Sequence, residues 1–85
     1  MKKWKWFVYI IECIDGLYYT GLTWNLEQRL EQHRSGKGSR FTKWHKFKEL
    51  RYFEEFNNLQ QARERERQLK DFSRQKKEAL WLRSR

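Results

Sequence analysis

The stretch that decides the fold runs from Phe7 to Thr23 and reads FVYIIECIDGLYYTGLT. Both of its halves are rich in β-branched and aromatic residues, which favour strands. Asp15-Gly16 stands between the halves and is a strong turn signal. The sequence therefore predicts a β-hairpin near the start of the chain.

The length of the hairpin loop decides which side chains share a face of the sheet. A two-residue loop of Asp15 and Gly16 would place Tyr9 and Tyr19 on opposite faces, because side chains alternate along a strand. A three-residue loop from Ile14 to Gly16, with Gly16 left-handed, shifts the pairing by one residue. Both tyrosines then lie on one face. The residues of the hairpin leave both registers open.

The pattern changes to a helical period after the hairpin. Asn25 is expected to cap a helix that ends near Ser35-Gly36, and residues 36–39 are expected to form a loop. That loop resembles a phosphate-binding loop only in composition, because it lacks the spacing of one. A third strand is expected from Phe47 to Phe56, with Leu50, Tyr52 and Phe56 on one face.

Two further helices complete the expected fold. Asn58 is expected to cap a long helix, and Ser73 a last helix from Arg74 to about Leu82. The prediction is a single α+β domain over residues 1–85. Its small three-stranded antiparallel sheet would be covered by two to three helices.

Glu66 is out of place in the helix after Asn58. The expected apolar stripe of that helix consists of Leu59, Ala62, Glu66 and Leu69. A carboxylate on a buried stripe costs several kcal/mol, roughly, unless it is paired or bound to a metal. The spacing leaves two interpretations open: a structural Glu–Arg pair, or a functional acid.

Composition limits the class of protein. The chain has 85 residues, a formal net charge of +9 and 18% aromatic residues. The only cysteine, Cys13, cannot form an intramolecular disulfide, which is typical of a reducing cytoplasm. The apolar run from Phe7 to Ile11 is too short for a secretory signal or a membrane span. We therefore expect a cytoplasmic protein that does not enter a membrane.

The excess positive charge indicates a polyanionic partner, most often nucleic acid. From His33 to Lys48 the chain carries several basic residues and no acidic one. Trp44 is a candidate for stacking on an unpaired base. The expected nucleic-acid-binding residues are Arg34, Lys37, Arg40, Lys43, Trp44 and Lys46.

Five polar residues could converge in this fold, and their order along the chain is informative. Tyr9 ends the tripeptide Phe7-Val8-Tyr9, and Tyr19 begins Tyr19-Thr20-Gly21. Arg29 and His33 follow one turn apart on the first expected helix, and Glu66 lies on the second. In this order and spacing the chain resembles the GIY-YIG nuclease superfamily. It is most similar to small stand-alone bacterial members, which resemble the nuclease domain of the repair protein UvrC.

The resemblance extends from Phe7 to Leu82 and favours the three-residue hairpin loop. In that register Gly21 shares a face with Tyr19, where the missing side chain would leave room for a phosphate or a helix, or would mark a simple bulge. Thr20 stands where the family usually has isoleucine, and Leu22 where some members carry a lysine.

The resemblance implies a metal-dependent endonuclease that hydrolyses DNA phosphodiester bonds, with a role in DNA repair. Glu66 would hold Mg²⁺ or Mn²⁺, and Arg29 would clamp the phosphate. Tyr9 would orient water or phosphate. The general base stays open between Tyr19, a phenol with an intrinsic pKa of about 10, and His33, with one of about 6.5.

Two other function classes fit the same basic chain. One is a non-catalytic module that binds nucleic acid through the same surface. The other is a domain that binds an acidic protein. Because the sequence has no separate DNA-targeting domain, any specificity would come from loops or from a protein partner.

Overall fold

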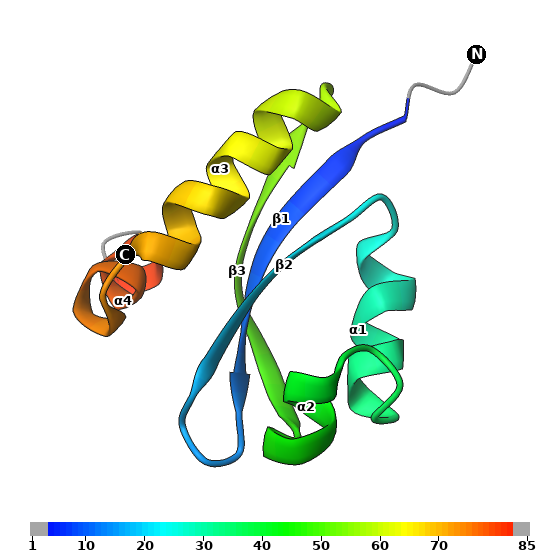
Figure 1. Cartoon of the computed structure of the whole chain (residues 1–85), viewed down its shortest axis with the longest axis vertical. Coiled ribbons are helices and arrows are strands. Elements are labelled where there is room, and N and C mark those ends of the chain that lie inside the picture. The colour runs from blue at the N-terminus through cyan, green and yellow to red at the C-terminus, as the bar shows by residue number, and fades with distance from the viewer. Residues whose placement is uncertain (1–3, 83–85) are drawn as a thin grey trace.

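The computed structural model describes residues 4–82, which form a three-stranded antiparallel sheet with strand order β2-β1-β3 and four helices (Figure 1). The elements are β1 (Trp6–Cys13), β2 (Tyr18–Thr23), α1 (Leu26–Arg34), α2 (Arg40–His45), β3 (Phe47–Phe56), α3 (Leu59–Asp71) and α4 (Arg74–Leu82). The predicted α+β class is confirmed, and α2 is an additional short helix. No helix among the described residues is long and apolar enough to cross a membrane.

The hairpin has the three-residue loop. Tyr9 pairs with Gly21, and Ile11 pairs with Tyr19, so these four residues lie on one face of the sheet. Gly16 has a φ of +87°, and its N–H closes the turn with a hydrogen bond of 2.9 Å. The register that brings the two tyrosines to one face is confirmed.

A bulge interrupts the pairing of β3 with β1. It inserts Arg51 as an extra residue between Leu50 and Tyr52. Those two side chains consequently point to opposite faces, and the expectation that Leu50 shares a face with Tyr52 and Phe56 is wrong. Arg51 itself turns to Glu12, with its Nη2 atom 2.6 Å from the carboxylate.

The helices divide between the two faces of the sheet. Figure 1 shows α3 on one side and α1 with α2 on the other, with the edge strand β2 between them. The main core lies under α3, where Val8 and Ile10 of β1 pack with Ala62 and Leu69. The opposite face carries the buried Tyr9 and the residues around it. An edge strand flanked by two helices therefore positions the site described below.

The three longer helices begin where their caps predict. The side chains of Asn25 and Asn58 each accept a backbone N–H at 3.1 Å, and Ser73 accepts one at 3.2 Å. The missed helix α2 is also capped, by Ser39, at 3.1 Å. Its six residues are too few to display a hydrophobic period, so only the Ser39 cap could have indicated it.

Candidate active site

Tyr9 lies at the centre of the residues that the sequence singled out. Its side chain is fully buried, and its ring lies across Gly21 of β2. A Cβ atom on Gly21 would come within 3.0 Å of three atoms of the phenol. The room that glycine leaves is therefore taken by Tyr9 itself, and the expectation that it admits a phosphate or a helix is wrong.

His33 of α1 is buried against the hydroxyl group of Tyr9. Its Nε2 atom lies 2.8 Å from that oxygen, and its Nδ1 atom lies 2.8 Å from Oγ1 of Thr42. The hydroxyl group of Thr42 is also placed to donate to the carbonyl of Ser39 at 3.3 Å, which suits the tautomer in which Nδ1–H donates to Thr42 and Nε2 accepts from Tyr9. Gly38 lets the loop cross the imidazole, because a Cβ there would fall within 3.0 Å of three ring atoms. The short helix α2 and the loop before it thus hold the imidazole in place.

Burial keeps both partners of this hydrogen bond uncharged. Desolvation raises the pKa of Tyr9 to about 12, and the nearby guanidinium of Arg29 opposes that rise. Desolvation, aided by the charge of Arg29, lowers the pKa of His33 to about 4. At neutral pH His33 is a neutral acceptor with both nitrogens engaged. The sequence left the general base open between Tyr19 and His33 on their intrinsic pKa values, and in the folded protein burial moves the pKa of His33 well below its intrinsic value of about 6.5.

Tyr19 is the accessible phenol of the pair. Its side chain is half-buried, and its ring centroid lies 5.2 Å from that of His33 and 5.5 Å from that of Phe41 in α2. Within residues 4–82 its hydroxyl group forms no hydrogen bond. These contacts hold the ring in place and leave the oxygen available to a substrate.

Arg29 extends the cluster on the α1 side. Its Nη1 atom donates to Oε1 of Gln32 at 2.9 Å, which orients the guanidinium. Its Nε atom is buried and has no hydrogen-bond partner in the described part of the chain. An unpaired buried donor costs about 1–3 kcal/mol, and this one is suited to donate to an anionic oxygen.

Glu66 approaches the cluster from the other side of the edge strand. It lies on α3, and its side chain is 21% exposed. Its charge is the smallest of the causes that act on the pKa of Tyr9, and it raises that pKa. The structural Glu–Arg pair that the sequence left open for Glu66 is formed by a different carboxylate: Arg65 pairs with Glu54 at 2.9 Å. Glu66 instead meets the exposed Lys70 at 3.3 Å through one oxygen, Oε2.

The same carboxylate is the candidate for holding a metal. Over residues 4–82 no group of three or more His, Cys, Asp or Glu side chains gathers in one place. Mg²⁺ commonly binds one or two carboxylates and takes its other ligands from water and substrate phosphate. Glu66 fits that arrangement, because its Oε1 atom has no partner among the described residues.

The predicted nucleic-acid-binding residues surround α2. All six are exposed, and Trp44 is 79% exposed. Arg34 pairs with Glu31 at 2.5 Å. Within the described chain no ion pair neutralises the other four cations, which are Lys37, Arg40, Lys43 and Lys46. They form a basic patch next to Tyr19, to which Phe41 connects them.

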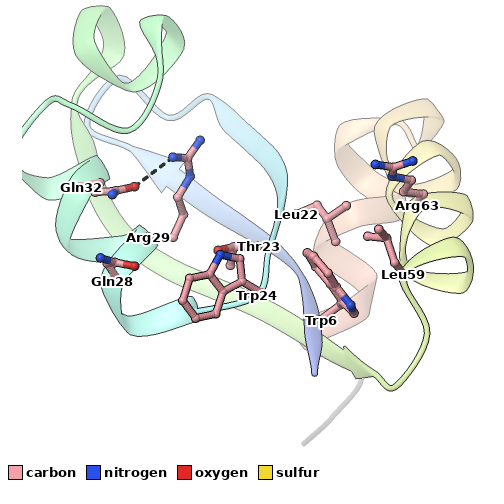
Figure 2. Close-up of a pocket in the computed structure, with 9 residues that line it drawn as sticks. All are labelled: Trp6, Leu22, Thr23, Trp24, Gln28, Arg29, Gln32, Leu59 and Arg63. Atoms are coloured by element: carbon pink, nitrogen blue, oxygen red, sulfur yellow. Dashed lines mark hydrogen bonds between the residues drawn. The ribbon is translucent and has the colours of Figure 1, made fainter. Parts of the chain in front are cut away.

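A groove of about 360 Å³ opens beside Arg29, between α1 and α3 (Figure 2). We call it the tryptophan groove; it is lined by Trp6, Leu22, Thr23, Trp24, Gln28, Arg29, Gln32, Leu59 and Arg63. This groove was not predicted from the sequence, because its residues come from three separate segments of the chain.

Comparison with known proteins identifies the family. The family described as the GIY-YIG catalytic domain matches residues 5–79, which is most of the chain. The chain belongs to the GIY-YIG family. GIY-YIG domains are of the nuclease type, and the resemblance stated from the sequence is confirmed.

Relatives of the same size support this assignment. A UPF0213 protein of Halobacterium salinarum is 42% identical over 87% of this chain and 96% of its own length. One from Staphylococcus haemolyticus is 44% identical over 86% of this chain and 89% of its own. The solution structure of a UPF0213 protein from Bacillus halodurans is 39% identical, with a TM-score of 0.57 over 89% of this chain and 81% of that one. This GIY-YIG chain is therefore similar to other small proteins of about its own length.

Proposed function

We propose that this GIY-YIG protein is a metal-dependent endonuclease that hydrolyses phosphodiester bonds of DNA. The observation that carries the proposal is the cluster formed by Tyr9, His33, Tyr19 and Arg29, with Glu66 across the edge strand. Hydrolysis of a phosphodiester requires a positioned phosphate, an activated water and stabilisation of the charge that develops on oxygen. The five residues supply groups suited to each requirement.

Arg29 is the phosphate-binding group of the proposed site. Its planar guanidinium can meet two phosphate oxygens at once, which a lysine cannot do. Gln32 holds one end of it, and the buried Nε atom is left to donate. A phosphate at this position would satisfy that donor and receive charge stabilisation where it is needed.

Tyr19 is the group that would face the attacking water. Its hydroxyl group is available, whereas both nitrogens of His33 are engaged and its pKa is lowered to about 4. His33 and Tyr9 are positioning residues in this scheme, since the rings of both pack against the ring of Tyr19. This geometry favours Tyr19 over His33 as the base.

Glu66 would hold the metal, Mg²⁺ or Mn²⁺. When bound, such an ion polarises the phosphate and stabilises the leaving oxygen. The basic patch around α2 would bind phosphates on the same side of the molecule as Tyr19, so that the DNA strand is presented to the cluster.

Cleavage of DNA in the presence of Mg²⁺ or Mn²⁺ tests the proposal. Plain, nicked and branched duplexes would be incubated with wild type, with Glu66→Gln and with Glu64→Gln. Glu64 is an exposed carboxylate on the same helix and is the matched control. We expect cleavage by wild type and Glu64→Gln and its loss in Glu66→Gln.

Two results would overturn the proposal. One is the absence of cleavage of all three substrates by wild type. The other is cleavage by Glu66→Gln at the wild-type rate. Salt-sensitive binding without cleavage would instead support the non-catalytic binding module, and a matching series of RNA substrates would reveal a preference for RNA.

A further inference from the structure

The tryptophan groove adjoins the proposed active site but contains none of the tyrosines, the histidine or the glutamate. Arg29 belongs to both places. Leu22 follows Gly21 on β2, and Arg63 lies one turn before Glu66 on α3. A strand whose phosphate rests on Arg29 would therefore place a neighbouring nucleotide at the groove.

The aromatic surface of the groove is partly exposed. Trp24 is 49% exposed, and its ring forms a T-shaped contact with that of Trp4 at a centroid distance of 5.3 Å and an interplanar angle of 79°. Trp6 forms part of the opposite wall with Leu22 and Leu59 (Figure 2). A large indole that is half-exposed is a surface on which a flat ring can stack.

The polar groups of the groove suit a nucleotide. Arg29 projects from α1 and Arg63 from α3, on opposite sides of the groove (Figure 2). Of the residues that line it in the described part of the chain, none is acidic. Gln28 and Gln32, one turn apart on α1, add amides that can both donate to and accept from the edge of a base.

The volume of the groove limits what can occupy it. Cavities of about 300 to 1,000 Å³ hold small organic ligands, and this one lies at the lower end of that range at about 360 Å³. It suits one nucleotide and is too small for a duplex. A base must leave its stack before it can lie on Trp24.

We infer that the tryptophan groove binds an unpaired base next to the phosphate held by Arg29, so that the protein selects strands with a frayed, displaced or single-stranded nucleotide at that place. The inference rests on the proposed function for the position of the phosphate. It assigns stacking to Trp24, which lines the tryptophan groove, whereas the sequence had favoured Trp44.

Binding without metal tests the inference separately from cleavage. The probes are a fluorescein-labelled oligothymidine and a fully paired duplex of equal length, followed by fluorescence anisotropy in EDTA. Trp24→Ala should weaken binding of the oligothymidine on the order of tenfold, the usual effect of losing one stacked base, and leave duplex binding unchanged. Trp44→Ala, the matched exposed tryptophan, should change the oligothymidine affinity by less than about twofold.

A second variant guards against misfolding. Gln28 is exposed on α1, so Gln28→Ala should fold normally and weaken the oligothymidine more than the duplex. Equal losses on both probes, or a Trp24→Ala protein that folds and binds like wild type, would overturn the inference. A protein that binds in this selective way but never cuts DNA would refute the proposed function and leave the groove assignment standing.

Discussion

The hydroxyl group of Tyr9 lies 2.8 Å from Nε2 of His33, although the two residues are 24 positions apart in the chain. Both groups are buried, and desolvation keeps both uncharged at neutral pH. The bond joins β1 to α1 directly behind Tyr19. It therefore couples the stability of the fold to the geometry of the candidate site.

Removing the hydroxyl group of Tyr9 should lower both the stability of the fold and the activity of the candidate site. Tyr9→Phe leaves a buried imidazole nitrogen unpaired, so the free energy of unfolding should fall by about 1–3 kcal/mol. Urea denaturation measures this loss, and cleavage of DNA should fall in parallel. Tyr18→Phe is the control, because its partner Glu78 is 30% exposed and can turn to water. Equal stability losses in the two variants would contradict the assigned role.

The pH dependence of stability follows from the pKa of His33. That pKa is lowered to about 4 in the folded protein, against about 6.5 in an unfolded chain. Between those values the unfolded state binds more protons, so stability rises with pH. The contribution, up to about 3 kcal/mol, is present above pH 6.5 and lost as the pH falls toward 4.

Unfolding free energies measured from pH 4 to pH 8 test this prediction. His33→Gln should have a flatter profile than wild type over that range. His45→Gln, which alters the half-exposed histidine paired with Asp15, should keep the slope that His33 contributes. An unchanged profile in His33→Gln would refute the assignment.

Gly21 should not tolerate a methyl group. An added Cβ would overlap the phenol of Tyr9, and overpacking of this kind costs about 1–3 kcal/mol. Gly21→Ala should therefore lower both the free energy of unfolding and the rate of cleavage. In a Tyr9→Leu background, where the overlapping ring atoms are absent, the same substitution should cost less. Additive costs in this double-mutant cycle would count against a direct clash.

Much of the fold was predictable because its signals are local. Asn25, Asn58 and Ser73 cap their own helices, and Asp15-Gly16 sets a turn in its own hairpin. Each depends on residues no more than three or four positions away. The hairpin register needed more than these signals, since the family resemblance decided between the two loops.

The features that were missed depend on contacts between distant segments. Arg51 lies at a bulge and pairs with Glu12 on the neighbouring strand, which no alternation within β3 can reveal. Thr42 meets His33 only because α2 folds back over α1. Trp24 could not be recognised from the sequence as a candidate for stacking, because the groove beside it lies between α1 and α3, which are far apart in the chain.

Replacing Arg29, the proposed phosphate-binding residue, should slow DNA cleavage more than it weakens DNA binding. Arg29→Lys keeps the charge and loses the planar pair of donors, so the cleavage rate should fall by about 10²-fold, as when one transition-state donor is removed. Arg67→Lys, an exposed position on α3, is the control. Single-turnover cleavage separates rate from affinity. A large loss of affinity with an unchanged rate would mean that Arg29 only anchors the DNA.

The basic patch around α2 should account for the salt dependence of DNA binding. Lys37 and Lys43 are exposed and have no ion pair among the described residues, so both are free to meet phosphates. Each phosphate contact with duplex DNA contributes about 0.9 to the slope of log affinity against log salt concentration, because it releases condensed counterions. The double variant Lys37→Gln, Lys43→Gln should therefore lower the slope by about 1.8. The variant Arg67→Gln, Lys76→Gln removes equal charge from α3 and α4, and its slope should match wild type. Equal slopes for the two double variants would place the DNA elsewhere on the surface, since only a patch in contact with phosphates can change the number of counterions released.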